Sequence, residues 1–204
     1  SKTMDDPGTI LGATNPYGTG DFWQTGLRIG LVHDSRNVPT WPTSGVLLDL
    51  EGAFYPEVFD IEDGSFRSLE GLASGVYSVF RFLALAGRIG AKGVWGNYPY
   101  WEAAYIGGVE TVRGYQAQRF AGDGAVFAGL EARVPVSSGL GEFGLFGLLD
   151  TGRVFLDGES SNRWHTGYGG GAWLTPLFRQ FTMSFSLADS REDTIFHFKI
   201  DTGF

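Results

Sequence analysis

The sequence has no cysteine and few charged residues, and these shortages exclude several classes of protein. Because cysteine is absent from all 204 residues, the chain has neither a disulfide framework nor a thiolate metal site. Charged residues make up 19% of the chain, below the roughly 25% of ordinary soluble domains. The net charge is −8, which opposes binding to a phosphate backbone, so no nucleic-acid partner is expected.

Motifs that carry enzyme chemistry are also missing. The chain contains no His-Glu-x-x-His, Gly-x-Ser-x-Gly or Walker sequence. His33, His165 and His197 stand in different strand-like segments without the spacing of metal ligands. The glycines at 167–171 have no helix after them to cradle a phosphate, and the acidic residues at 60–63 lack the spaced ligands of a calcium loop. We therefore expect no catalytic residues, no bound metal and no cofactor.

Long apolar runs are absent as well, although the chain is far from polar. Hydrophobic residues make up 43% of the sequence, yet no run approaches the roughly 18 residues that a membrane-spanning helix needs. The chain instead has 32 glycines and 15% aromatic residues. Apolar and aromatic residues spread over short alternating segments are typical of a β-barrel, and of a membrane barrel in particular.

About nine segments alternate apolar with polar side chains at a period of two, which predicts an all-β, antiparallel fold. These segments are 22–35, 45–57, 65–79, 81–95, 124–135, 142–155, 165–176, 180–188 and 193–204. Residues 1–21 have closely spaced Gly, Pro, Asn and Asp and are expected to form a loop. Residues 96–122, between two of the strands, are expected to form a second connection, called the long loop below.

A soluble β-sandwich would show the same alternation, because it also buries one face of each strand. Two features favour a membrane barrel instead. The predicted strands are about 11–14 residues long, against about 5–6 in soluble sheets. Aromatic residues also gather near strand ends, as the interface girdles of membrane barrels require. The girdle candidates are Trp23, Tyr55, Trp95, Trp164 and Phe204.

Several motifs, in order along the chain, resemble those of a known family. They are His33 to Asn37 followed by Pro42 and Gly45, Ile106-Gly107-Gly108 followed by Val112-Arg113-Gly114-Tyr115, Gly129 to Pro135, and Leu149 to Val154. From residue 22 to the end, the chain resembles the C-terminal barrel of the bacterial surface antigen family. This family is the BamA/TpsB superfamily of outer-membrane assembly and translocation proteins.

The resemblance implies a location in the bacterial outer membrane and a set of functional residues. Phe198, Ile200 and Phe204 resemble the C-terminal strand signal of outer-membrane barrels. The functional loop would comprise Gly107, Gly108, Val112, Arg113, Gly114 and Tyr115.

A charged side chain that enters a barrel lumen needs a partner of opposite charge. Glu131 and Asp150 fall on the lumen faces of the two strands that follow the long loop. Both match the family positions that contact the loop arginine, so we expect Arg113 to bind one or both of them. Without the resemblance, an arginine in a loop is more often solvated.

The strand count predicts that the chain is incomplete. Membrane barrels end on the periplasmic side and place their long loops outside. Counting back from the last strand puts residues 96–122 and Ser1 on the extracellular side, and the long loop is expected to fold from there into the lumen. The resemblance implies a barrel of about sixteen strands, in which the missing N-terminal strands and any POTRA domains would lie upstream or on a partner chain. The rival reading, a tenth strand within residues 1–12, is disfavoured by Pro7 and Gly8.

Three functions are therefore open. The first is insertion or translocation of unfolded outer-membrane or secreted proteins, with membrane lipids as the surroundings. The resemblance implies a mechanism without ATP, in which the first and last strands of the barrel pair weakly and expose a seam to the incoming strand. The second is a membrane anchor for a surface enzyme such as a patatin-like lipase. The third is a passive pore, which a lumen filled by the long loop would oppose.

Overall fold

The protein is built around one antiparallel sheet. The computed structural model describes residues 24–38, 40–57, 64–138, 141–159, 162–176 and 181–202. Nine strands pair in the order β1-β2-β3-β4-β7-β8-β9-β10-β11. They are β1 (Leu27–Asp34), β2 (Gly45–Tyr55), β3 (Phe66–Phe80), β4 (Leu83–Gly96), β7 (Gly124–Ser138), β8 (Gly141–Phe155), β9 (His165–Pro176), β10 (Phe181–Asp189) and β11 (Thr194–Thr202). The predicted all-β class and the predicted nine strands are confirmed.

The first strand and the long loop both differ from the prediction. The first strand begins at Leu27, so residues 24–26 are not part of it. The long loop contains secondary structure of its own, namely the short 3-10 helix η1 (Tyr100–Glu102) and a hairpin of β5 (Ala104–Ile106) and β6 (Phe120–Gly122). Single apolar residues in a Gly-rich segment gave no periodicity from which so short a hairpin could be predicted.

Strand alternation divides the sheet into two chemically different faces. Large apolar side chains are exposed on one face, and these include Leu27, Ile29, Leu31, Leu48, Leu50, Leu69, Leu85, Ile89, Leu130, Leu145, Leu149, Leu187, Phe196, Phe198 and Ile200. Alternate residues on the same strands, such as Arg88, Glu131 and Asp150, point to the opposite face. An exposed face made of leucine, isoleucine and phenylalanine matches the apolar outer band of a membrane barrel.

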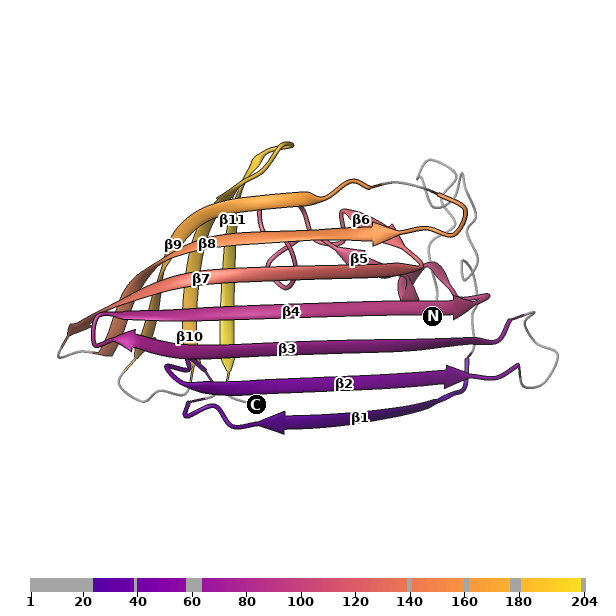
Figure 1. Cartoon of the computed structure of the whole chain (residues 1–204), viewed down its shortest axis with the longest axis horizontal. Coiled ribbons are helices and arrows are strands. Elements are labelled where there is room, and N and C mark those ends of the chain that lie inside the picture. Colours follow the sequence, from indigo (N-terminus) through magenta and orange to yellow (C-terminus); the bar gives the residue numbers. More distant parts are fainter. Residues whose placement is uncertain are drawn as a thin grey trace.

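The sheet curls, so that β10 and β11 run steeply across the direction of β1 to β4 (Figure 1). The hairpin of β5 and β6 lies on the inner side of this curve (Figure 1), and we call that side the concave face. In the described residues each of β1 and β11 has one neighbour, because they stand at the two ends of the sheet order. The polar alternate residues therefore line a hollow that the sheet only partly encloses.

The expected girdle is only partly correct. Trp95 and Trp164 are each 49% exposed and lie near strand ends, as predicted. Tyr55 instead stacks on the buried Phe66, with ring centroids 4.4 Å apart, on the concave face. Trp23 and Phe204, like the loop at residues 1–21, lie outside the described residues. Within the described part of the chain, no helix has the length and apolar character needed to cross a membrane.

Candidate functional site

The tip of the long loop, residues 107–115, is a compact turn that depends on its glycines. Gly107, Gly108 and Gly114 have φ angles of 115°, 91° and 92°, in the region that side chains with a Cβ rarely adopt. The Gly108 N–H donates to the carbonyl oxygens of Val112 and Tyr115, at 3.1 Å in both cases. The Gly107 N–H donates to Thr111 Oγ1 at 2.7 Å. The tip therefore has internal hydrogen bonds of its own, in addition to its contacts with the sheet.

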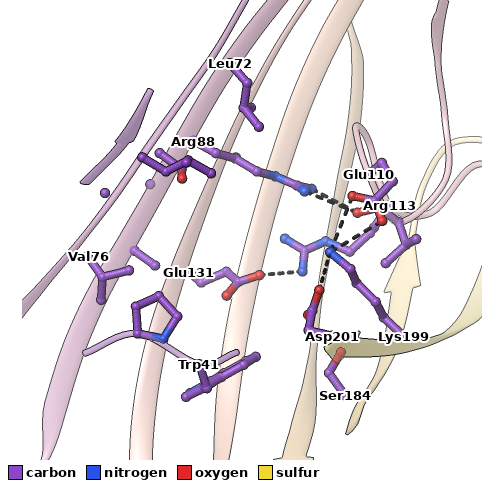
Figure 2. Close-up of a pocket in the computed structure, with 18 of the residues that line it drawn as sticks. Trp41, Leu72, Val76, Arg88, Glu110, Arg113, Glu131, Ser184, Lys199 and Asp201 are labelled. Carbon is purple, nitrogen blue, oxygen red and sulfur yellow. Dashed lines mark hydrogen bonds and ion pairs between the residues drawn. The ribbon is translucent and has the colours of Figure 1, made fainter. Parts of the chain in front are cut away.

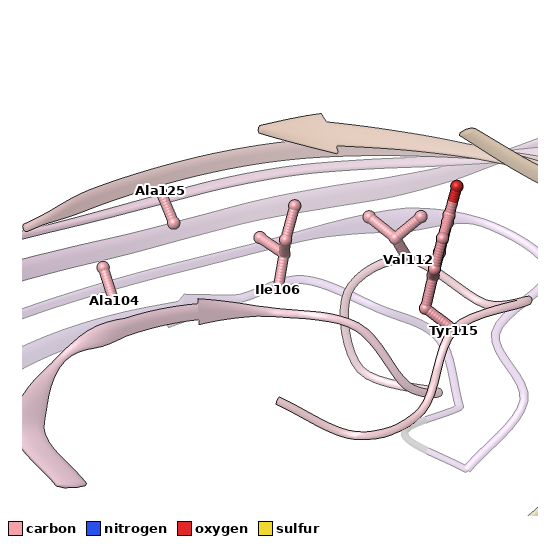
Figure 3. Close-up of a cluster of buried hydrophobic side chains, with 5 residues drawn as sticks. All are labelled: Ala104, Ile106, Val112, Tyr115 and Ala125. Atoms are coloured by element: carbon pink, nitrogen blue, oxygen red, sulfur yellow. The ribbon is translucent and has the colours of Figure 1, made fainter. Parts of the chain in front are cut away.

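Two apolar side chains anchor this tip to the concave face. Val112 is fully buried and Tyr115 is 2% exposed. They form a cluster with Ala104, Ile106 and Ala125, in which the loop side chains face the sheet (Figure 3). The rings of Phe120 and His165 meet Tyr115 edge-on. Burial of Val112 and the Tyr115 ring is worth about 1.5–3 kcal/mol per side chain, which opposes the entropy lost on fixing the loop.

Between these two anchors, Arg113 binds the carboxylates of two adjacent strands. Its Nε donates to Asp150 Oδ2 at 2.6 Å and its Nη2 to Asp150 Oδ1 at 2.9 Å, a two-pronged contact. Its Nη1 donates to Glu131 Oε1 at 2.6 Å, and its backbone N–H donates to Asp150 Oδ2 at 3.1 Å. Arg113 is 5% exposed and Asp150 is fully buried. Such charge-assisted, bidentate bonds fix both the position and the orientation of the guanidinium.

Two further arginines complete this charged cluster, and Figure 2 shows Arg88 and Glu131 on either side of Arg113. Arg88 Nη2 lies 3.5 Å from Asp150 Oδ2, and its guanidinium also donates to the carbonyl oxygens of Val109 and Thr111. On the other side, Arg133 Nη2 lies 2.8 Å from Glu131 Oε2. Three guanidinium groups thus surround two carboxylates, so each carboxylate is needed to compensate the buried positive charge.

Glycines on the sheet make room for the loop. A Cβ on Gly167 would overlap the Arg113 carbonyl oxygen, and one on Gly129 would lie 2.5 Å from Asp150 Oδ1 and 3.0 Å from Arg88 Nε. Gly129 and Gly167 are the cross-strand partners of Asp150 on β7 and β9. The residues on both sides of Asp150 therefore have no side chain on the concave face, which leaves space for the loop backbone and for Arg88.

The base of the long loop is tied to the ends of neighbouring strands. The Tyr98 hydroxyl donates a short hydrogen bond to Asp123 Oδ1, and the Asp157 N–H donates to Asp123 Oδ2 at 2.7 Å. The bond from Tyr98 is the main cause that holds the pKa of Asp123 below its usual value. Burial, followed by the Asp123 contact, raises the pKa of the Tyr98 hydroxyl. A carboxylate therefore links the segments that follow β4 and β8.

The turn between β1 and β2 also reaches onto the concave face. Its Trp41 ring stacks on Trp173 of β9 with centroids 4.9 Å apart, and it lies 6.1 Å from the ring of Phe146. The Arg133 guanidinium lies 4.1 Å from the centroid of the Trp41 ring. Residues from this turn, from the long loop and from both halves of the sheet line a cavity of about 410 Å³. The turn was predicted only as a tight connection, and its inward position is a finding of the structure.

Comparison with known proteins assigns this fold to a family. The model of the Omp85 superfamily domain matches residues 2–204. The chain belongs to the Omp85 superfamily. No curated protein matches it.

Among solved structures, the Omp85 chain resembles BamA from Haemophilus ducreyi lacking POTRA domains 1–3, with a TM-score of 0.69. The identity is 15%, and the match covers 85% of this chain and 41% of that one. The chain thus spans less than half of the structure it resembles. The predicted family resemblance and the outer-membrane location are confirmed, because Omp85 barrels are bacterial outer-membrane proteins.

The structure brings most of the predicted site residues of this Omp85 chain together. Arg113 contacts both Glu131 and Asp150, and the predicted loop residues all lie in or beside the tip. Phe198 and Ile200 are 48% and 52% exposed on the apolar face.

 

Other predicted features have different outcomes. Phe204 and the acidic residues at 60–63 lie outside the described residues. Within the described ranges, no group of three or more His, Asp or Glu side chains is placed to hold a metal ion. Sequence reasoning assigned no role to Arg88 or Gly129. Strand parity places Arg88 on the polar face, but it does not show which loop atoms approach that position.

The position of Trp41 gives a first prediction. Trp41→Ala is tested in a chain that also has Thr40→Cys, whose thiol serves as a labelling site and is called the reporter. The alanine removes the ring stack on Trp173 and the cation–π contact with Arg133, which together are worth about 1–2 kcal/mol. Thr40 is 5% exposed and its hydroxyl has no hydrogen-bond partner, so a cysteine there leaves no polar group unpaired. We expect a water-soluble maleimide to label the reporter about tenfold faster in the Trp41→Ala background.

The control for this experiment is Trp95→Ala in the same reporter, because Trp95 lies on the opposite, exposed face. The natural chain has no cysteine, so all labelling comes from the reporter. Equal labelling rates in the two backgrounds would show that Trp41 does not hold the turn on the sheet.

Proposed function

We propose that this chain forms the C-terminal part of an outer-membrane barrel that inserts or translocates unfolded outer-membrane or secreted proteins without ATP. The remaining strands of a barrel of about sixteen, together with POTRA domains or a partner chain, would complete it. Membership of the Omp85 superfamily, a family of outer-membrane assembly and translocation proteins, supports the general class. The observation that carries the specific proposal is the long loop bound to β7 and β8 by Arg113.

The docked loop stabilises the central strands β4, β7 and β8 more than the edge strand β11. The charged cluster joins β4, β7 and β8 through Arg88, Glu131 and Asp150, and the Val112 and Tyr115 anchors add apolar contacts there. The strands β7 and β8 have 15 residues each, whereas the last strand, β11, has nine. A short edge strand forms fewer backbone hydrogen bonds with any partner, so a seam at β11 opens at lower cost than one at β7 or β8.

An edge strand with free N–H and C=O groups is a template for another strand. A client strand that pairs with β11 gains main-chain hydrogen bonds, and its apolar side chains align with the exposed Phe196, Phe198 and Ile200. This pairing needs no nucleotide, because the free energy comes from the hydrogen bonds and apolar burial of the client itself. In this proposal, the long loop keeps the rest of the wall rigid while the seam opens.

The test uses the native polypeptide reconstituted in liposomes and a small outer-membrane barrel client diluted from urea. We expect the protein to accelerate client folding several-fold over empty liposomes, as read by protease protection and gel mobility without heating. An Arg113→Ala variant, which inserts but cannot bind Asp150, should lose most of this acceleration.

Three outcomes would contradict the proposal. The first is client folding at the rate of empty liposomes. The second is a steady conductance without any effect on clients, which would favour a passive pore. The third is release of fatty acids from the liposomes by the native polypeptide, which would favour an anchor for a lipase.

A further inference from the structure

The last hairpin of the sheet, β10 and β11, binds both backbone polar groups of Gly114 in the loop tip. The Gly114 N–H donates to His197 Nε2 of β11 at 3.1 Å, and the Ser190 hydroxyl donates to the Gly114 carbonyl oxygen at 2.7 Å. Both polar groups of one residue are therefore bound by side chains of the same hairpin. These two contacts are separate from the cluster of Arg113, Glu131 and Asp150.

Ser190 also organises the turn between β10 and β11. Its backbone N–H donates to the Asp193 carbonyl oxygen at 3.0 Å, and its hydroxyl oxygen accepts from the Glu192 N–H at 3.1 Å. The hydroxyl proton is then directed to Gly114, the nearer of its two carbonyl neighbours. One side chain thus joins the hairpin turn to the loop.

The approach of the hairpin to Gly114 is too close for a side chain. A Cβ on Gly114 would lie 2.9 Å from the Asp189 carbonyl oxygen and 3.1 Å from Ser190 Cβ. The positive φ of Gly114, 92°, directs its N–H and C=O to the two hairpin residues. Glycine at this position therefore serves the contact with the hairpin as well as the shape of the tip.

His197 acts here as a hydrogen-bond acceptor. Since a backbone N–H always supplies the proton, Nε2 of His197 must be unprotonated, and the proton of the neutral ring sits on Nδ1. Two ion pairs lie around this contact, from Arg119 to Glu192 at 2.8 Å and from Lys199 to Glu110 at 3.4 Å. The side chains of both ion pairs are substantially exposed, so these pairs contribute little to the stability of the contact between the hairpin and the loop.

We infer that Ser190 and His197 are positioning residues that clasp the last hairpin to Gly114 and so control how readily β11 separates to receive a client strand. The inference rests on the proposed function for its consequence, but not for the contact itself. β11 is the edge of the sheet in the described chain, and this clasp joins it to the loop that is bound to β7 and β8. Loss of the clasp would free the edge strand while leaving the loop docked by Arg113.

The test compares His197→Leu, His197→Gln and Ser190→Ala in the native polypeptide by hydrogen–deuterium exchange. Leucine leaves the Gly114 N–H unpaired, so we expect exchange in residues 189–197 to rise about tenfold. Glutamine places an amide oxygen near the position of Nε2 and should restore slow exchange. Ser190→Ala should also raise exchange, while trypsin cleavage after Arg113 stays as slow as in the wild type.

Client folding in liposomes is measured on the same variants. If His197→Leu leaves the exchange unchanged, the clasp is refuted. If exchange rises but the client folding rate of an active wild type does not change, the contact stands and its control of the seam is refuted. If the wild type itself does not fold clients, the proposed function fails, and the exchange results still decide whether the clasp exists.

Discussion

Asparagine in place of Asp150 is expected to release the loop tip from the sheet. Asp150 is fully buried and accepts three hydrogen bonds from Arg113, and its loss leaves the guanidinium groups of Arg88, Arg113 and Arg133 with one carboxylate. Removing one partner of a buried ion pair costs about 3–5 kcal/mol. The population of released loop should therefore rise by a factor of at least about a hundred.

Limited trypsin digestion measures this release directly. Arg113 is 5% exposed in the docked loop, so the bond after it should resist cleavage, whereas the side chain of Arg119 is exposed and provides an internal reference. When opening is fast, proteolysis follows the population of the open form. In Asp150→Asn, cleavage after Arg113 should approach the rate of cleavage after Arg119.

Two further variants separate charge from geometry. Asp49→Asn makes the same chemical change at an exposed position on β2 and should leave the digestion pattern unchanged. Arg113→Lys keeps the charge but lacks the planar fork that binds both carboxylates, so it should give an intermediate cleavage rate. Slow cleavage after residue 113 in Asp150→Asn would show that the ion pair does not hold the loop.

The sequence predicted the strands and the faces of the sheet well because a period of two decides both. Leu149 and Asp150 fall on opposite faces by parity alone, and the structure places them so. The partners of Arg113 came from the family resemblance, since parity put Glu131 and Asp150 on the right face but did not tell which loop atom would reach them. The predicted geometry of the site therefore depended on two kinds of information.

Contacts between segments that are distant in the chain could not be predicted from the sequence. Trp41 lies in a proline-rich turn, and nothing in its neighbours shows that it stacks on Trp173 across the concave face. Strand parity puts His197 on the polar face of its strand, but its bond to Gly114 depends on the curl of the whole sheet. Such contacts are set by tertiary structure, which local periodicity does not predict.

The contacts on the concave face form one continuous series. Arg133 lies over the Trp41 ring and binds Glu131, which binds Arg113 of the loop. Gly114, the next residue, binds the last hairpin through His197. The turn between β1 and β2, the long loop and the edge strand β11 are thus joined through neighbouring side chains, so a change at one of them has a physical route to the others.

Alanine in place of Gly167 is expected to undock the same loop without changing any charge. The added Cβ would overlap the carbonyl oxygen of Arg113, and Gly167 pairs directly with Asp150 across β8 and β9. The backbone of Arg113 must then move away from the sheet, which stretches its bonds to Asp150. Overpacking of this kind typically costs about 1–3 kcal/mol, so cleavage after Arg113 should rise about tenfold or more.

Gly147→Ala is the matched control for this variant, because a Cβ at Gly147 meets its nearest atom, the Gly169 carbonyl oxygen, at 4.0 Å. It should keep the loop protected and the client folding rate unchanged. If Gly167→Ala and Asp150→Asn both release the loop and both slow client folding, docking itself is the cause, since only one of them alters the charge. If Gly167→Ala leaves Arg113 protected, the close approach of the loop to β9 does not exist, and the ion pair alone would have to position the loop.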